Sequence, residues 1–176
     1  MQQRQKGLTL VELMVTLAVA IILSASGMPL FTGVSANNRA TAQSNSLLAA
    51  IRLARSEAVK RSTDVSICPV SDPSAASPSC TGNDDDWHLG WSVFFLDNSS
   101  TAQHIRTWDA PPGNPTIDSN SATSIQFDST GSATAVTNIA LSLDDAAGIQ
   151  SRCIAINTGG QIRMKRYDPD NGGTCP

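Results

Sequence analysis

The feature that most constrains this chain is an apolar run close to its N-terminus. Residues 8–23 read LTLVELMVTLAVAIIL, in which Glu12 is the only charged side chain. With the weakly polar continuation to residue 31, a helix over 8–31 would be roughly 36 Å long, enough to cross a hydrocarbon core of about 30 Å. The basic residues of the polar leader 1–7 keep that leader in the cytoplasm. The sequence therefore predicts one pass through an inner membrane, with the rest of the chain outside.

A cleaved secretory signal peptide is the alternative interpretation of this run. Small residues at 24–26 would serve as the cleavage site. Glu12 argues against it, because an ionisable group in an apolar helix is costly and usually survives only with a partner or a function. We therefore expect the segment to be retained.

The pair Lys6-Gly7 followed by LTLVEL at 8–13 resembles the cleavage and methylation site of type IV pilins and secretion pseudopilins. The resemblance implies that a prepilin peptidase cuts between Gly7 and Leu8, and that the new N-terminus at Leu8 is methylated. Most members begin the mature chain with phenylalanine, so Leu8 is a departure. Glu12 of one subunit is then expected to neutralise the Leu8 ammonium of its neighbour, setting the register of assembly.

A second helical segment follows the apolar run. Pro29 stands where pilins also carry proline, and a proline inside a helix favours a kink or local opening. Beyond it, the spacing of four apolar residues predicts one buried helix face, consisting of Leu47, Ile51, Ala54 and Ala58. Glu57 is placed to pair with Arg61 one turn on. The other basic residues of the helix are expected on its solvated surfaces, where they are Arg52, Arg55 and Lys60.

Beyond residue 63 the helical period ends, and short runs rich in Val, Ile, Phe and Thr alternate with turn residues. These runs predict strands, with a hairpin turn at 157–160. The connections 71–86 and 109–122 are polar and rich in Pro, Ser and Asn, which predicts loops. The predicted strands are 63–68, 90–96, 103–108, 124–128, 135–143, 152–156 and 161–166.

Two further stretches narrow the resemblance. The helix end ARSEAVKR at 54–61, and the segment WHLGW at 87–91 with Phe127, Asp128 and Gly131 downstream, resemble minor pilins and pseudopilins of the GspH/FimT type. The resemblance implies an α+β type IV pilin fold, in which a long N-terminal helix packs on an antiparallel β-sheet head. The expected parts are the leader 1–7, the transmembrane half-helix 8–31, the amphipathic half-helix 32–62 and a β-rich periplasmic or extracellular head 63–176.

Four cysteines lie outside the membrane on this topology, where disulfides form in a diderm bacterium. Joining Cys68 with Cys80 and Cys153 with Cys175 is one of three possible connectivities, and both closed loops would be short. A zinc site is the competing interpretation. The chain has no C-x-x-C, and its histidines lack ligand spacing, so structural disulfides are favoured.

The sequence holds no recognisable catalytic set. The run 84–86 beside His88 is typical of a solvated acidic loop, and a calcium loop starting at Asp168 would need a glutamate beyond the last residue. Nucleophile-elbow, P-loop and HExxH motifs are absent from the sequence. We therefore expect no enzyme, no metal and no cofactor, with calcium binding at 168–172 as the alternative left open. An exported enzyme tethered to the membrane is the least favoured class.

The one constellation that suggests ligand binding is basic and C-terminal. Arg163 and Lys165 fall on one face of a predicted strand by alternation, and a patch of this kind can neutralise DNA phosphates. DNA-uptake members of the FimT branch carry G-R-x-R at a matching hairpin, whereas this chain has Gln161 in place of the first arginine. From residue 63 onward the chain has five Lys and Arg and thirteen Asp and Glu. The resulting net negative charge repels DNA at long range. The candidate DNA-binding residues are Arg152, Arg163, Lys165 and Arg166.

The sequence thus favours a minor pilin that helps to initiate or cap a pilus for motility or adhesion, with its place in the pilus near the tip. A DNA-binding minor pilin for natural transformation and a minor pseudopilin of type II secretion remain as alternatives. The expected partners are other major and minor pilins or pseudopilins, the prepilin peptidase and inner-membrane lipid, with DNA under the second alternative.

Overall fold

The computed structural model describes residues 9–113, 115–142, 151–167 and 175, without the side chains of 25–36 and 167. The chain divides into two compact units, Met1–Ser35 and Ala36–Pro176. Helix α1, Leu10–Arg61, begins in the first and ends in the second. The predicted leader and the cleavage point between Gly7 and Leu8 lie outside the described residues.

In the first unit, α1 starts after Thr9, whose Oγ1 accepts a hydrogen bond from the Glu12 backbone N–H at 3.3 Å, as an N-cap residue does. The side chains from Leu10 to Leu23 are exposed. The backbone is helical without interruption through position 29, so the local opening expected at Pro29 does not occur. Part of the predicted span 8–31 lies outside the described side chains; within those described, no helix has both the length and the apolar character needed to cross a membrane.

In the second unit, residues 36–61 of α1 carry the apolar face that the spacing predicted. All four predicted residues are fully buried, namely Leu47, Ile51, Ala54 and Ala58. The predicted ion pair is also present, with Arg61 Nε 2.6 Å from Glu57 Oε2, and Lys60 adds a second contact at 3.2 Å. Val59, which flanks the buried face, is 51% exposed.

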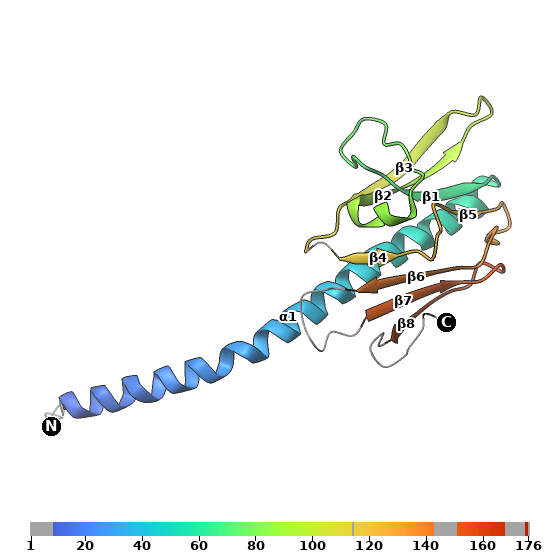
Figure 1. The fold of residues 1–176 in the computed structure, drawn as a ribbon. Helices are drawn as coiled ribbons and strands as arrows, with labels where there is room; N and C mark the ends of the chain where they lie inside the picture. Colours follow the sequence, from blue (N-terminus) through green and yellow to red (C-terminus); the bar gives the residue numbers. More distant parts are fainter. Residues whose placement is uncertain (1–8, 114, 143–150, 168–174, 176) are drawn as a thin grey trace, which may run out of the picture. The chain divides into compact units, whose positions relative to one another are not determined.

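The head contains two antiparallel sheets rather than one (Figure 1). The first has the order β3-β2-β1-β5 and the second the order β4-β6-β7-β8. The strands of the first sheet are β1 Val65–Pro69, β2 Gly90–Leu96, β3 Ala102–Asp109 and β5 Ile125–Phe127. The strands of the second sheet are β4 Thr116–Asp118, β6 Thr137–Ser142, β7 Ser151–Ile156 and β8 Ile162–Tyr167.

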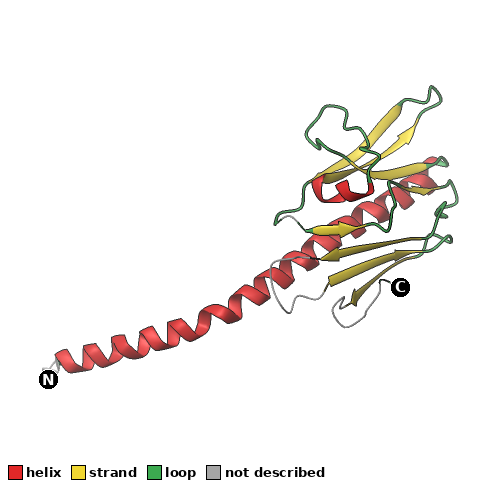
Figure 2. Ribbon diagram, viewed as in Figure 1, coloured by secondary structure: helices red, strands yellow, loops and turns green. Residues whose placement is uncertain are grey.

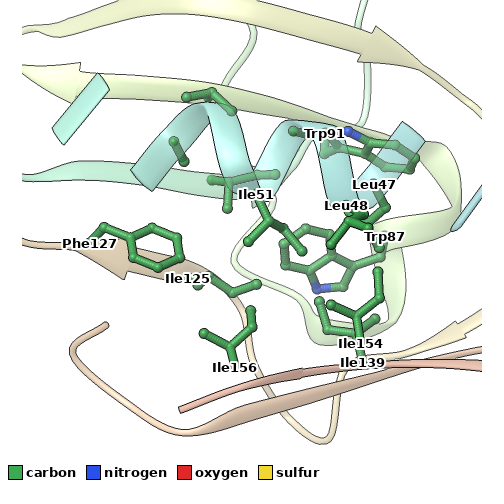
Figure 3. Packing of buried hydrophobic residues seen from close by; sticks show 14 of the residues in the cluster. Leu47, Leu48, Ile51, Trp87, Trp91, Ile125, Phe127, Ile139, Ile154 and Ile156 are labelled. Carbon is green, nitrogen blue, oxygen red and sulfur yellow. The ribbon is translucent and has the colours of Figure 1, made fainter. Parts of the chain in front are cut away.

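Both sheets lie beside the C-terminal part of α1 (Figure 2). Their buried apolar side chains form one cluster with those of the helix. In the first sheet, Val65 lies opposite both Phe95 and Phe127, and in the second, Ile154 lies opposite Ile139 and Met164. Directly opposed residues point to the same side of a sheet, so these registers bring the apolar residues together. Figure 3 shows Ile51 of α1 directed into the buried cluster, which also contains Phe127 of the first sheet and Ile139 and Ile154 of the second. The core therefore lies between α1 and the two sheets.

One element begins in a segment predicted to be a loop, and another lies wholly within one. The 3₁₀ helix η1, Asp84–Leu89, is capped by the side chain of Asn83 and buries Trp87, whose Nε1 donates a hydrogen bond to the Ala122 carbonyl at 2.9 Å. Strand β4 pairs with β6 within the second predicted loop. These contacts pack the two polar connections against the core.

Two disulfides fasten the head. Cys68 is bonded to Cys80 and Cys153 to Cys175, with Cα–Cα distances of 5.6 and 5.5 Å. The closed loops are short, with sequence separations of 12 and 22 residues. This is the connectivity proposed from the sequence, and it leaves no free thiol in the described residues.

Candidate functional site

The β7–β8 hairpin presents the basic residues that the sequence singled out. Its turn is closed by the Gly160 N–H, which donates to the Asn157 carbonyl at 2.9 Å, and by the Gln161 N–H, which donates to the Asn157 side chain at 2.8 Å. Gly160 adopts a φ of +68°, a conformation that glycine tolerates best. The predicted hairpin at 157–160 is therefore present.

The register of this hairpin distributes the basic residues of β8 over two faces. Arg163 lies opposite Ala155 and Lys165 opposite Cys153, on the face directed away from α1, as alternation predicted. Arg166 pairs with Arg152 on the opposite face, the one that carries Ile154 and Ile162. The side chains of Arg163, Lys165 and Arg166 are exposed.

Arg152 is not part of this exposed set, which corrects the sequence prediction. It is 3% exposed, and its Nη2 donates to Asn37 Oδ1 at 3.2 Å and to Thr41 Oγ1 at 3.0 Å. Burial, with a smaller contribution from the charge of Arg166, lowers the pKa of Arg152. Arg152 thus fastens β7 to α1 and cannot reach a phosphate group.

Arg55 has a structural contact that the sequence did not reveal. Its Nε donates a hydrogen bond of 2.9 Å to the Gly131 carbonyl, which belongs to the turn after β5. A Cβ atom at Gly160 would collide with that same carbonyl oxygen and lie 2.9 Å from Arg55 Nε. The tip of the hairpin, the turn and the helix therefore meet so closely that only glycine fits at position 160.

A groove runs between α1 and β8, the edge strand of the second sheet within the described residues. Its volume is about 540 Å³, and it combines two guanidinium groups with apolar side chains. The lining residues are Arg52, Arg55, Ser56, Val59 and Ile162. A surface of this composition can hold an acidic partner that also offers apolar contacts.

The remaining candidates from the sequence give no chemical site. His88 Nδ1 lies 2.7 Å from the Asp85 carbonyl within η1, a local contact that shapes the 3₁₀ turn. In the part of the chain that the structure describes, His, Cys, Asp and Glu residues form no group able to hold a metal ion. The calcium candidate starting at Asp168 lies outside the described residues.

Comparisons with known proteins agree with this fold. The family model described as "Type II transport protein GspH" matches residues 43–160, and the prokaryotic N-terminal methylation motif matches residues 2–28. No curated protein matches the chain.

Among solved structures, the type IV minor pilin FimU of Pseudomonas aeruginosa is 20% identical, covers 83% of this chain and 95% of its own, and gives a TM-score of 0.53. A second crystal form of FimU gives 0.51 at 21% identity, with 80% and 95% coverage. The minor pseudopilin EpsH from the type 2 secretion system of Vibrio cholerae gives 0.53 at 12% identity, with 73% and 97% coverage. These structures share the fold, and the family model covers most of the chain, so the protein belongs to the GspH family of minor pilins and pseudopilins.

Proposed function

We propose that this protein is a minor type IV pilin that helps to initiate or cap a pilus. The observation that carries the proposal is the methylation motif at 2–28 joined, in one chain, to a GspH head at 43–160. The motif is where a prepilin peptidase would cut, between Gly7 and Leu8. The head would remain on the periplasmic side, and no catalytic step is required.

The exposed apolar side chains of α1 support this role. Leu10, Ile21 and Leu23 are each more than 60% exposed. Surface of this kind is stable when covered by lipid or by other apolar helices. Assembly would transfer the segment from the inner membrane to a bundle of pilin helices. Glu12 would then pair with the Leu8 ammonium of a neighbouring subunit.

Replacing Glu12 tests this mechanism. We expect Glu12→Gln protein to be processed and to stay in the membrane fraction, but to be missing from sheared filaments, because its carboxylate can no longer neutralise the neighbour's ammonium. Thr16→Val is the matched control, because Thr16 lies one turn away and its hydroxyl bonds only the Leu13 carbonyl in the described structure. Equal amounts of both variants in filaments would contradict the role of Glu12.

A minor pseudopilin of type II secretion is the second candidate, and the description of the matched family model favours it. Deleting the gene separates the two roles. If the protein is a pilin, the deletion strain is expected to lose surface filaments and to continue secreting exoproteins. If it is a pseudopilin, the deletion strain is expected to keep its surface filaments and to lose secretion of exoproteins.

DNA uptake is the third candidate, and it is supported by the shared face of Arg163 and Lys165. A titration of the full chain in detergent against duplex DNA at two salt concentrations tests it. Binding that falls with salt, with a slope reduced by about 2 in Arg163→Ala/Lys165→Ala, would support this function. Arg106→Ala is the control, because Arg106 is exposed on β3 of the other sheet and stacks over Trp108. Absence of binding at low salt would exclude it.

A further inference from the structure

A hollow of about 540 Å³ lies on the first sheet, beside the C-terminal end of α1. Sites for small molecules have volumes of about 300–1,000 Å³, so this hollow is large enough to hold one. Its walls combine hydroxyl, carboxylate and amide groups with aromatic and aliphatic side chains. Among the residues that line it are Ser62, Asp64, Ser66, Phe94, Leu96 and Gln126.

The strand register places the floor of the hollow on the outer face of the sheet. Val65 is fully buried and faces the core. Because side chains alternate along a strand, its neighbour Ser66 lies on the other face, with Phe94 opposite it in β2 and Gln126 opposite it in β5. A half-buried aromatic ring, a hydroxyl and an amide therefore form one row across three strands.

The polar side chains of the hollow can make more hydrogen bonds than they do. Gln126 Nε2 donates to Asp64 Oδ2 at 2.7 Å, which orients both groups. Among the described residues, this is the one hydrogen bond that the side chains of Asp64, Ser66 and Gln126 make. A carboxylate oxygen, an amide carbonyl and a hydroxyl can therefore bind the polar groups of a ligand.

Ser62 adds a hydroxyl at a position where glycine is the usual residue. The Thr63 N–H donates to the Ala58 carbonyl at 3.3 Å and the Ser62 N–H donates to the Val59 carbonyl at 3.4 Å, the pattern of a Schellman cap. Ser62 has a φ of +53°, which is less favourable for serine than for glycine. Its hydroxyl lies at the hollow, and no described residue hydrogen-bonds to it.

The charge around the hollow favours an uncharged ligand. Asp64 is the one charged residue among the described residues that line it, and its carboxylate repels phosphates and acidic sugars. Arg61 is close by, with its guanidinium 4.6 Å from the centre of the Phe95 ring, but it is paired with Glu57 at 2.6 Å. A nucleic acid or an acidic polysaccharide is therefore disfavoured here.

We propose that this hollow binds a neutral saccharide, with one pyranose ring as the unit that it recognises. The C–H groups on one face of a pyranose are positively polarised and pack on the negative face of an aromatic ring such as Phe94. Neighbouring ring hydroxyls both donate and accept hydrogen bonds, which matches the adjoining carboxylate and amide of Asp64 and Gln126. The inference goes beyond the proposed function, which concerns assembly alone.

Titration of the ¹⁵N-labelled full chain, in a detergent without a sugar headgroup, tests the inference. The probes are the methyl glycosides of glucose, galactose and mannose. We expect at least one of them to shift the backbone amide resonances of Ser66, Leu96 and Gln126 in a saturable manner. Sorbitol is the control ligand, because it is a polyol without a ring face, and we expect it to bind about tenfold more weakly. Methyl glucuronide is expected to bind more weakly because of its charge.

Matched variants make the test specific. Gln126→Ala removes the amide of the hollow, whereas Gln103→Ala removes an amide that donates to Asp97 Oδ2 at 3.0 Å on the same sheet but does not line the hollow. We expect the first variant to bind the glycoside about fivefold more weakly and the second to bind it as the parent does. Ser62→Gly relieves the backbone strain, so we expect it to keep or raise the Tm while it also weakens binding about fivefold. Its loss of binding cannot result from misfolding.

The inference is overturned if no methyl glycoside shifts the amide resonances of the hollow, or if Gln126→Ala and Gln103→Ala bind the glycoside equally well. Equal affinity for sorbitol would also overturn it, because the ring face would then have no role. Tighter binding of the glucuronide would overturn it by requiring a cationic site. The Glu12→Gln filament assay tests a different part of the chain, so the proposed function can stand when saccharide binding fails.

Discussion

At the scale of single residues, Gly160 has the least room for a side chain among the described glycines. A side chain there meets the Gly131 carbonyl oxygen and the Arg55 guanidinium, and φ is +68°. We expect Gly160→Ala to destabilise the fold by about 2 kcal/mol or more, since strain and collision add. The matched control is Gly159→Ala, whose Cβ would meet nothing closer than Asn157 Oδ1 at 3.5 Å. Equal urea midpoints for the two variants would contradict the packing described for the hairpin tip.

Glu57 makes the stability of the C-terminal end of α1 depend on pH. Hydrogen bonds from Arg61 and then Lys60 lower the pKa of Glu57 below its ordinary value of 4.5. Because the folded-state pKa lies below the unfolded one, the stabilisation is complete above pH 4.5 and is lost as the pH falls through the folded-state value. We expect Glu57→Gln to be less stable than the parent at neutral pH, with a difference that shrinks on acidification. Urea unfolding of both proteins at pH 7 and at about pH 3 measures this difference in the free energy of unfolding. A difference that stays constant or grows on acidification would contradict the role of the Glu57 carboxylate.

Arg152 shows that a functional role inferred from residue type alone can be wrong when the face of the strand that carries the residue is not considered. Its charge placed it among the ligand-binding candidates, whereas its position two and four residues before Ile154 and Ile156 puts it on the buried face. The alternation of β7 was thus the signal that could have identified its role. Arg55 offered no such signal, because its partner is a backbone carbonyl 76 residues further along the chain.

At the scale of elements, the Cys68–Cys80 disulfide fixes the loop that follows β1. We expect Cys68→Ala/Cys80→Ala to lose about 3 kcal/mol, or roughly 5–10 °C in Tm, because the unfolded chain regains the freedom that the closed loop removes. Thermal unfolding under non-reducing conditions compares the variant with the parent. An unchanged Tm would mean that β-sheet contacts alone order the loop.

The sequence predicted the elements whose periodicity is strong and missed those formed by long-range contacts. Seven of the eight strands were expected from runs of β-branched and aromatic residues. Strand β4 has three residues in a polar, proline-rich segment, and η1 depends on the burial of Trp87 against distant residues. The division into two sheets depends on the pairing of β1 with β5, which are far apart in the sequence. No local pattern encodes such a pairing.

At the scale of the whole molecule, the chain joins an apolar helical segment to a compact head. The fold and the family follow from the head and the N-terminal motif together. The described residues contain a groove lined by two arginines and by apolar side chains. Under the proposed function, the molecule acts by assembly, and the central event is the exposure of a new amine at the start of the apolar helix.

Mass spectrometry of the N-terminal peptide, taken from filaments sheared off the native cell, tests this account most directly. The account predicts a chain that begins at Leu8, carries a methyl group on its α-amine and retains Glu12. A mature chain that begins after the apolar segment, near residues 24–26, would contradict it, because such a chain has neither the amine nor the carboxylate that assembly requires.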